Sequence, residues 1–305
     1  MTKLTACLIV KNEELFIQRC IESLLRVSDE IIITDTGSID KTKDICSNYP
    51  QVKVFDYEWD DNYSNPRNDG LKYATGDWIL FVGADEVLSD ELVKNLPGLL
   101  SNQYDNNTVF CFNVLNPSPN GITTSYFRQA LFKNNQGIKF FRPIHEQLIK
   151  ENEELININC PEMNIIHYNK MKLNQDLETK YSKYIGILNK AIENNNDKID
   201  NYYYYHHLGN AYAQKNEHKK AYEAFLNSYN LYNEGKYDKK TLAYGTILIK
   251  LISQLVIYSD IKSQAQIYLD ELFSISPDFT DGLFYQTIVF QENKEYEKAL
   301  DNARK

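Results

Sequence analysis

The sequence predicts an α/β domain built on a largely parallel sheet, followed by an all-α domain. Four apolar runs of strand length alternate with helical patterns over roughly the first hundred residues, which is typical of a doubly wound sheet. Short strand patterns without intervening helices then follow as far as Tyr168, and from about Leu173 the pattern is helical to the end. The predicted domains are therefore residues 1–170 and residues 171–305.

Bulk composition narrows the function classes. The 305 residues are enough for two domains, and 43% hydrophobic residues are ordinary for a globular protein. A net charge of −9 argues against a general nucleic-acid binder, whose affinity comes from basic side chains. The 5 cysteines are scattered without a CxxC pair and are predicted to be buried thiols of a reducing compartment. No run is apolar enough to span a membrane, and charges come too early for a secretory signal, so the predicted location is cytoplasmic.

The strands of the parallel sheet are predicted from four short runs, the first of which is near-continuously apolar and suits a strand covered on both faces. They are Leu4–Val10, Glu30–Thr34, Val52–Tyr57 and Trp78–Val82. The helices between them are predicted to begin at Asn12-Glu13-Glu14, at Lys41 after a cap by Ser38 or Asp40, and at Arg67 after Ser64 and Pro66, with another helix near Ser89–Leu100. Right-handed crossovers would bring the carboxyl ends of the strands to one edge, where such sheets bind ligands.

Further strands are predicted in the second half of the first domain, and we expect them to extend the sheet and to cover the ligand crevice. They are Thr108–Leu115, Thr123–Phe132, Ile138–Phe141, Leu148-Ile149, Leu155–Ile158 and Asn164–Tyr168. The turn-rich stretch Asn116–Gly121 separates the first two.

The helical domain has the spacing of a tetratricopeptide repeat. Two weak copies are registered on Ala265 and Ala299, and their interval equals the repeat length of about 34 residues. A clearer copy is formed by Tyr205, Leu208, Gly209, Tyr212, Ala221 and Phe225. The interval from Ala221 to Ala265 is longer and requires an insertion or longer helices. Because a solenoid needs a capping element and the last copy stops early, we expect a fragment of a longer protein; a natural end with a frayed helix is the alternative.

Polar residues gather where the predicted parallel strands end. The loops are Asn12-Glu13-Glu14, Asp35-Thr36-Gly37-Ser38-Ile39-Asp40 and Gly83-Ala84-Asp85-Glu86. Arg67 opens the helix before the fourth strand, and its guanidinium can reach the same space. Carboxylates at such an edge suit Mg²⁺ or Mn²⁺, which can in turn hold a diphosphate. A lone acidic pair would be interpreted as a solvated turn, so the prediction depends on the loops acting together.

These segments together resemble the family 2 glycosyltransferases, which have the GT-A fold, a Rossmann-like domain with a mixed sheet. The resemblance covers about Leu4 to Tyr168 and depends on four segments in the expected order. They are the N-E-E after the first strand, the D-x-G-S-x-D-x-T of Asp35–Thr42, the P-R-N of Pro66–Asn68, and a D-x-D-like motif at Gly83-Ala84-Asp85. The resemblance implies a nucleotide-sugar donor, namely a UDP-sugar.

The resemblance also implies roles for single residues. Asp35 would accept a hydrogen bond from the nucleobase, at the N3–H of uracil, and Asn12 and Glu13 would line the base or the ribose. Arg67 would bind the diphosphate with its fork of donors. Asp85 would coordinate the cation that helps the nucleotide to leave. The alternatives are helix caps for Asp35, Asn12 and Glu13 and a surface position for Arg67.

One position departs from the family pattern. Gly83 stands where the first acid of D-x-D is expected, so one carboxylate is missing. We expect His167, near the end of a predicted strand, to complete the metal site with Asp85, and an imidazole favours Mn²⁺ over Mg²⁺. A structural histidine is the alternative.

The catalytic base is expected in the second half of the domain, because direct displacement needs a group that takes the proton of the acceptor. Arg142-Pro143-Ile144-His145-Glu146 resembles an R-x-x-H-E segment of some family members, which implies Glu146 as the base. His145 would orient Glu146 or touch a phosphate, and the alternative is a solvated pair on an edge strand. The family resemblance also implies inversion at the anomeric carbon.

The predicted function is transfer of N-acetylglucosamine or glucose from a UDP-sugar to a Ser, Thr or Cys side chain of a protein. The fused helices resemble those of bacterial flagellin O-glycosyltransferases and peptide S-glycosyltransferases, and a solenoid offers an extended surface to a polypeptide such as flagellin. One alternative is an enzyme that acts on lipopolysaccharide or a cell-wall glycan. Another is an inactive binding module, which the glycine at position 83 keeps open.

Overall fold

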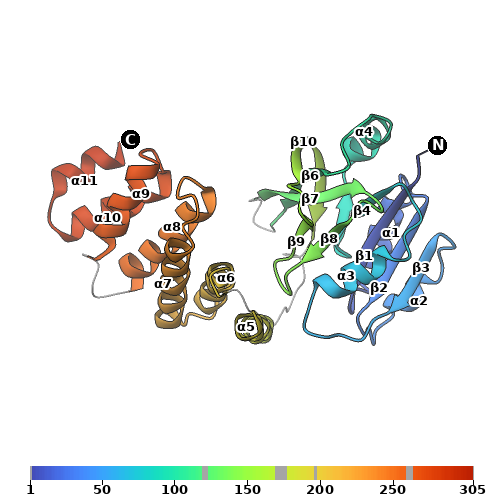
Figure 1. The fold of residues 1–305 in the computed structure, drawn as a ribbon, viewed down its shortest axis with the longest axis horizontal. Helices are drawn as coiled ribbons and strands as arrows, with labels where there is room; N and C mark the ends of the chain where they lie inside the picture. The colour runs from blue at the N-terminus through green and yellow to red at the C-terminus, as the bar shows by residue number, and fades with distance from the viewer. Residues whose placement is uncertain (1, 119–122, 169–176, 196–197, 259–263, 305) are drawn as a thin grey trace. The chain divides into compact units, whose positions relative to one another are not determined.

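The chain forms two compact units, Met1–Gln175 and Asp176–Lys305 (Figure 1). The computed structural model describes residues 2–118, 123–168, 177–195, 198–258 and 264–304. The predicted boundary at residues 170 and 171, the helical start at Leu173 and part of the turn Asn116–Gly121 lie outside the described residues. A mixed-sheet unit followed by a helical unit is the fold class that the sequence predicts.

Within the described residues, an eight-stranded sheet frames the first unit, in the order β3-β2-β1-β4-β7-β6-β10-β5. The strands β1 (Leu4–Val10), β2 (Glu30–Asp35), β3 (Val52–Asp56) and β4 (Trp78–Phe81) pair in parallel, as predicted. The others are β5 (Glu86–Leu88), β6 (Thr108–Asn116), β7 (Thr124–Lys133) and β10 (Ile156–His167). Because β7 runs antiparallel to both β4 and β6, most of the second half of the unit continues the same sheet. The strands expected at Ile138–Phe141 and Leu148-Ile149 do not extend it, because they pair with each other in a separate two-stranded sheet.

Two strand predictions need correction. The separate strands expected at Leu155–Ile158 and Asn164–Tyr168 are one strand, β10, with a bulge between Cys160 and Asn164. The bulge contains Pro161, which has no N–H to offer to a ladder. The short strand β5 was not predicted, because three residues are too few to show a period.

Alternate residues of the parallel strands face two different layers. Leu4, Ala6 and Leu8 of β1 pack with α1 (Ile17–Leu24), α2 (Thr42–Cys46) and α4 (Asp90–Leu100) in one hydrophobic core. Cys7 faces the opposite core, to which α3 (Ser64–Leu71) and the separate hairpin of β8 (Ile138–Phe141) and β9 (Gln147–Lys150) contribute. Burial on both faces explains the apolar runs of β1, β2 and β4, whereas the edge strand β3 is only partly buried.

Two helices start at other residues than predicted because local backbone and capping decide the start. α1 begins at Ile17, after the predicted Asn12–Glu14 start, since Asn12 has a left-handed backbone with φ 57°. α2 begins at Thr42, whose N–H donates to Asp40 Oδ1 at 3.0 Å. Of the two residues proposed to cap this helix, it is therefore Asp40 that accepts a hydrogen bond from the first backbone N–H.

The helix that carries Arg67 begins earlier than predicted, at Ser64. Asn62 Oδ1 accepts the N–H groups of Ser64 at 2.8 Å and Asn65 at 3.3 Å, so the capping oxygen comes from Asn62 and not from Ser64. Pro66 then lies in the first turn, where its missing N–H costs no intrahelical hydrogen bond.

The second unit contains helices only, within the part that the structure describes. They are α5 (Leu177–Asn194), α6 (Asn201–Gln214), α7 (His218–Glu234), α8 (Leu242–Tyr258), α9 (Ala265–Ile275), α10 (Thr280–Glu292) and α11 (Tyr296–Ala303). The α6–α7 and α10–α11 turns have the same form, with Asn216 at φ 59° and Lys294 at φ 62°. A Cβ at Gly209 would lie 2.6 Å from the ring of Phe225, so α6 and α7 can pack this closely only because position 209 is glycine. The repeated turn supports the predicted repeats.

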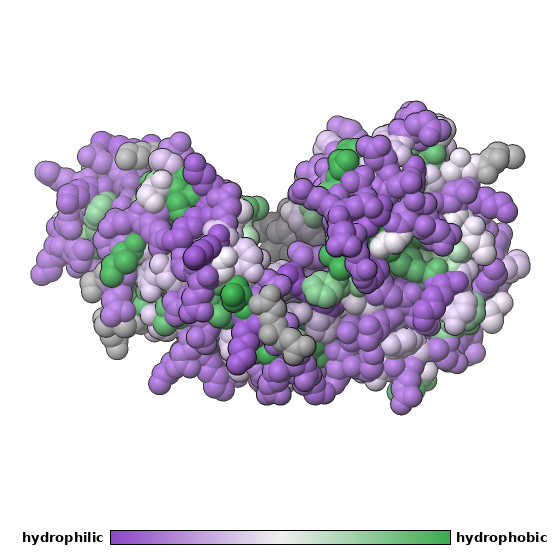
Figure 2. All heavy atoms as spheres, viewed as in Figure 1, coloured by the Kyte–Doolittle hydropathy of each residue, from purple (hydrophilic) through white to green (hydrophobic). Residues whose placement is uncertain are grey.

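Among the described residues, no helix combines the length and the apolar character needed to cross a bilayer. On the face drawn in Figure 2, hydrophilic residues dominate and the hydrophobic ones are scattered.

Candidate active site

The loops after β1 and β2 are fastened to each other at the carboxyl edge of the sheet. The N–H of Asn12 donates to Ser38 Oγ at 2.9 Å, and Asn12 Oδ1 accepts the N–H of Ile39 at 2.9 Å. The N–H of Glu13 donates to Thr42 Oγ1 at 2.8 Å. Ser38, one of the two caps proposed for α2, therefore binds the neighbouring loop instead. Asn12 and Glu13 reach the predicted edge, and their roles toward a base or ribose stay predictions.

Asp35 is fully buried at the end of β2. Its Oδ1 accepts the N–H groups of Gly37 at 2.8 Å and Ser38 at 2.7 Å. Its Oδ2 is buried and has no hydrogen-bond partner among the described residues. A buried acceptor without a partner is costly, so this oxygen is suited to a donor group of a bound molecule.

Asp85 and His167 meet at the ends of β10 and of the turn after β4. His167 Nε2 lies 3.4 Å from Asp85 Oδ1, and the two side chains are 17% and 14% exposed. His167 Nδ1 lies 2.9 Å from Asn116 Oδ1, while the amide nitrogen of Asn116 donates to the carbonyl of Thr124 at 3.3 Å. Asn116 Oδ1 is thus the acceptor and Nδ1 of His167 the donor. In the neutral imidazole, Nε2 then turns a lone pair toward a carboxylate, an arrangement that suits a proton or a cation between them.

This pair fits the predicted metal site in its chemistry. A carboxylate oxygen beside an imidazole nitrogen is a donor set that Mn²⁺ accepts. The hydrogen bond from His167 to Asn116 fixes the ring as outer partners of metal ligands do. Among the described residues, no group of three His, Cys, Asp or Glu side chains could hold a metal. A cation here would therefore take further ligands from a bound molecule or water.

A buried ion pair fills the place of the missing acid. Glu86 is 1% exposed and pairs with Arg128 through both oxygens, at 2.6 and 2.7 Å, and its Oε2 also accepts the N–H of Gly83 at 2.7 Å. A Cβ at Gly83 would lie 3.1 Å from Glu86 Cδ and 3.2 Å from Asp85 Oδ1. Burial alone would raise the pKa of Glu86, but the charge and hydrogen bonds of Arg128 lower it below its ordinary value. Position 83 therefore has little room for a side chain.

Arg67 and Glu146 form an ion pair in the wall of a cavity of about 300 Å³. Nε and Nη2 of Arg67 both bind Glu146 Oε1, and the side chains are 18% and 13% exposed. The guanidinium lies over Phe81, with Cζ 4.1 Å from the ring centroid. Burial lowers the pKa of Arg67, partly opposed by the charge of Glu146. Gly83 also lines the cavity, which brings the proposed base next to the turn that holds Asp85.

His145 does not share this position. It is exposed, its backbone is left-handed with φ 52°, and it is not one of the residues that line the cavity. Its proposed role beside Glu146 stays a prediction. Sequence reasoning missed Arg128, Phe127 and Gln129, which line the cavity from β7. A single arginine in a strand pattern carries no signal, since its partner Glu86 is distant in sequence.

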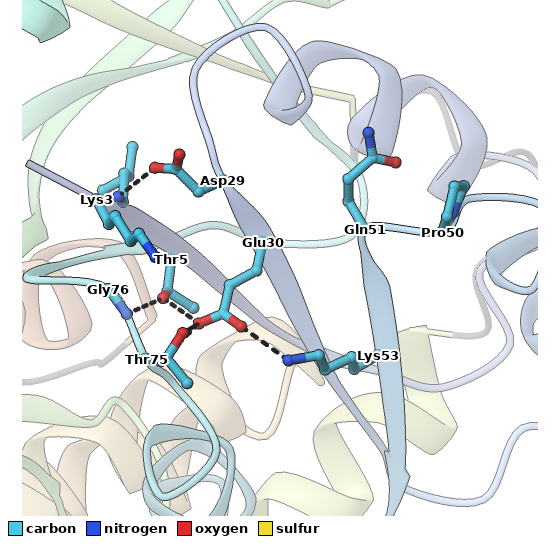
Figure 3. A pocket seen from close by; sticks show the side chains of 10 residues that line it. Lys3, Thr5, Asp29, Glu30, Pro50, Gln51, Lys53, Thr75 and Gly76 are labelled. Atoms are coloured by element: carbon cyan, nitrogen blue, oxygen red, sulfur yellow. Dashed lines mark hydrogen bonds and ion pairs between the residues drawn. The ribbon is translucent and has the colours of Figure 1, made fainter. Parts of the chain in front are cut away.

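A second cavity of about 300 Å³ lies at the opposite edge, at the amino ends of the parallel strands (Figure 3). Glu30 is its central group. Its Oε1 accepts from Thr5 Oγ1 at 2.7 Å and from the N–H and Oγ1 of Thr75 at 2.6 and 2.8 Å, while Oε2 accepts from Lys53 at 3.1 Å. Because the polar groups of this cavity form hydrogen bonds with one another, we interpret them as a structural cluster and not as a ligand site.

A comparison with known families decides the assignment of the first unit. The pattern of glycosyl transferase family 2 matches residues 5–171, more than half of the chain. The chain belongs to glycosyl transferase family 2. All the predicted site residues of this family 2 enzyme lie inside the matched stretch.

Several curated proteins are similar to this family 2 chain. A TPR repeat-containing protein of Synechococcus elongatus is 36% identical over 147 residues, which are 48% of this chain and 35% of that protein. The SPbeta prophage-derived glycosyltransferase SunS of Bacillus subtilis is 30% identical over 155 residues, 50% of this chain and 36% of SunS. The lipopolysaccharide core biosynthesis glycosyltransferase LpsC of Rhizobium meliloti is 36% identical over 101 residues, 32% of this chain and 37% of LpsC. The matched stretches span little more than a third of each relative.

Solved structures of S. aureus TarS are more distant. The complex with UDP has a TM-score of 0.44 at 13% identity and covers 96% of this chain and 92% of that chain. The complex with UDP-GlcNAc has a TM-score of 0.41 at 12% identity and covers 97% and 89%. At this level of similarity nothing follows about the ligand of this chain.

Proposed function

We propose that this chain is an inverting glycosyltransferase that moves a sugar from a UDP-sugar to a side-chain hydroxyl or thiol of a protein. The observation that carries the proposal is the cavity at the end of β4, where Arg67 and Glu146 lie beside the turn of Asp85. Groups for binding a diphosphate, for holding a cation and for taking a proton therefore lie within one part of the sheet edge.

The donor would be held at three points. Asp35 offers its unpartnered Oδ2 to the N3–H of uracil, at the sheet edge where the loops after β1 and β2 are cross-linked through Asn12. Arg67 binds the diphosphate with its parallel donors. Asp85 and His167 would hold Mn²⁺, or Mg²⁺ at lower preference. When bound, the cation neutralises the charge of the departing diphosphate.

The transfer itself needs one proton acceptor. Glu146 takes the proton of the acceptor hydroxyl or thiol while the new bond forms at the anomeric carbon and the bond to the diphosphate breaks. Attack from the face opposite the leaving group inverts that carbon. The side chain of Glu146 is 13% exposed and lines the cavity, so an acceptor that enters the cavity can reach it.

The acceptor is proposed from the second unit. Stacked helical hairpins present an extended surface that suits a polypeptide, such as flagellin. The similar protein of Synechococcus elongatus is also named as a TPR repeat-containing protein. N-acetylglucosamine or glucose is the proposed sugar. The similarity to LpsC favours a second candidate, in which the acceptor is lipopolysaccharide or another glycan. In a third, suggested by Gly83, the first unit binds but does not transfer.

Calorimetry with UDP and Mn²⁺ tests the donor site. We expect the wild type to bind UDP more tightly with Mn²⁺ than without it, and Asp85→Ala to lose that difference. Asp90→Ala, at an exposed position of α4, is the matched control and should behave as the wild type. Absence of UDP binding by the wild type would contradict the proposal.

A transfer assay tests the base. Glu146→Gln should retain donor binding and lose sugar transfer, because an amide cannot take the proton. Full transfer by this variant would remove Glu146 from the mechanism. Wild-type protein that binds UDP but transfers no sugar to any protein or glycan would favour the inactive module.

A further inference from the structure

We infer that Arg67 has a second role, as a positioning residue: it holds Glu146 in the donor-free protein and releases it when a diphosphate takes its place. The inference rests on the proposed function, because it takes Glu146 as the base and Arg67 as the diphosphate ligand. Its consequence is that the base becomes available only after the donor has bound.

The geometry of the pair supports an exchange of partners. Both donors of the guanidinium edge, Nε and Nη2, bind the single oxygen Oε1 of Glu146. The face of the guanidinium is covered by aromatic rings, with Cζ 4.1 Å from the centroid of Phe81 and 5.4 Å from that of Phe140. The ring contacts fix the plane of the guanidinium, so a diphosphate that uses this donor edge has to displace the carboxylate.

The other arginine of the cavity wall is committed elsewhere. Arg128 pairs with Glu86 through two hydrogen bonds of 2.6 and 2.7 Å, and Glu86 is 1% exposed. Opening that pair would leave a buried carboxylate without its counter-charge, which is expensive. Arg67 faces a carboxylate that is 13% exposed and lines the cavity, so water and an incoming acceptor can solvate Glu146 after release.

Exchange at Arg67 also orders the reaction chemically. While Oε1 of Glu146 accepts from both Nε and Nη2 of Arg67, that oxygen is occupied and cannot meet the proton of an acceptor. The diphosphate brings at least two negative charges and matches the guanidinium fork with two oxygens. Donor binding would thus place Arg67 on the leaving group and free Glu146 for the acceptor in one event, which predicts that the donor binds before the acceptor reacts.

A double-mutant cycle on UDP binding tests the exchange. Calorimetry with UDP and Mn²⁺ compares the wild type, Glu146→Gln, Arg67→Gln and the double variant. We expect Glu146→Gln to tighten UDP binding by about fivefold or more, the lower end of usual coupling between sites. In the Arg67→Gln background, the same change should alter the affinity by less than about twofold, because the gain needs a free Arg67. Glu151→Gln, on the same hairpin and paired with the exposed Lys139, is the control and should leave UDP affinity unchanged.

The outcomes separate the inference from its foundation. Unchanged or weaker UDP binding by Glu146→Gln would overturn the exchange. An equal gain in UDP affinity in the wild-type and Arg67→Gln backgrounds would also overturn it, because such a gain indicates simple repulsion between Glu146 and the diphosphate. Arg67→Gln alone could abolish UDP binding. In that case, UDP binding by the double variant would overturn the inference, and absence of UDP binding by the double variant would support it. Circular dichroism checks that each variant is folded. If Glu146→Gln is unfolded, Glu146→Ser takes its place, and we expect the same gain in UDP affinity. Absence of UDP binding by the wild type would instead contradict the proposed function itself.

Discussion

At the scale of single residues, the acids at the carboxyl edge differ in how completely their oxygens are satisfied. Glu86 has both oxygens bound by Arg128 and one also by a backbone N–H, so it is structural. Asp85 lies beside His167 at the surface of the edge, and Asp35 leaves one buried oxygen unpartnered. The degree of satisfaction therefore separates acids that support the site from those that can bind a ligand.

Asp35→Asn tests base recognition at this unpartnered oxygen. The amide keeps an oxygen for the turn at Gly37 but places an NH₂ group where Oδ2 stands. Two donors then face each other, so we expect UDP binding to weaken by at least about tenfold, roughly 1.4 kcal/mol. CDP, whose cytosine N3 is an acceptor, should lose less. Calorimetry measures both, with Asp44→Asn at an exposed position of α2 as control. Equal losses for UDP and CDP would point to a damaged loop instead.

Gly83→Asp tests whether the family acid can be restored. The new Cβ would meet Glu86 Cδ at 3.1 Å, and a third carboxylate would enter beside Asp85 and Glu86. We expect a melting temperature lower by several degrees and no gain in Mn²⁺ affinity, because overpacking and like charge outweigh an extra ligand. Gly98→Ala in α4, where a Cβ would meet nothing within 4 Å, should not destabilise the protein. Tighter Mn²⁺ binding by Gly83→Asp would contradict this expectation and show that the contacts of Glu86 around position 83 can rearrange.

At the scale of elements, Glu30 fastens the amino ends of three strands and the turn before a fourth. Burial alone would raise its pKa, but hydrogen bonds from Thr5 and Thr75 and the pairing with Lys53 lower the pKa to about 2 from the ordinary 4.5. A carboxylate with a lowered pKa stabilises the fold above its unfolded pKa. Its contribution is present above about pH 4.5 and is lost as the pH falls toward 2.

Glu30→Gln should remove this contribution. We expect the free energy of unfolding at neutral pH to fall by about 2 kcal/mol, since the donors of Thr5, Thr75 and Lys53 lose a charged acceptor. The difference between wild type and variant should shrink between about pH 4.5 and pH 2. Urea unfolding at several pH values measures it, with the exposed Glu58→Gln as control. A difference that does not change with pH would assign the stabilisation to packing.

Most elements of the first unit could be predicted from the sequence, and the exceptions have local causes. The buried strands β1, β2 and β4 are predictable because burial on both faces leaves an apolar run. The start of α3 was missed because its capping oxygen belongs to Asn62, and no pattern distinguishes that residue from Ser64. β10 was divided because the bulge at Pro161 interrupts its period. Such features are decided by single hydrogen bonds and not by periodicity.

The roles of the candidate site residues stay predictions, and of the close pairs at this edge, that of Asp85 with His167 could be predicted from the sequence but those of the two arginines could not. Asp35, Asp85 and Arg67 could be placed because motifs follow strand ends in a known order. The pair of Arg67 with Glu146 joins residues 79 positions apart, and that of Arg128 with Glu86 joins residues 42 positions apart. Nothing in either local stretch names its distant partner, because only the folded sheet brings the two together.

At the scale of the whole molecule, each unit has its own hydrophobic core. The core of the first lies on both faces of the sheet, from Leu4 to Ile165. A core of the second runs from Tyr232 to Val289 through the helices. Separate cores mean that the first unit can be expected to fold without the second, and this allows donor chemistry and acceptor binding to be tested apart.

A chain that ends at Gln175 tests whether the first unit binds the donor without the second. It retains Asp35, Arg67, Asp85 and Glu146, so we expect its UDP affinity to stay within about twofold of the full chain, as for independent sites. Hydrolysis of the UDP-sugar should persist, whereas transfer to a protein acceptor should be lost because the helical surface is missing. Calorimetry and mass spectrometry of a co-expressed acceptor such as flagellin measure the two activities, and circular dichroism checks the fold. Protein glycosylation by the shortened chain would refute the docking role of the helices, and retained transfer to a glycan alone would favour the lipopolysaccharide alternative.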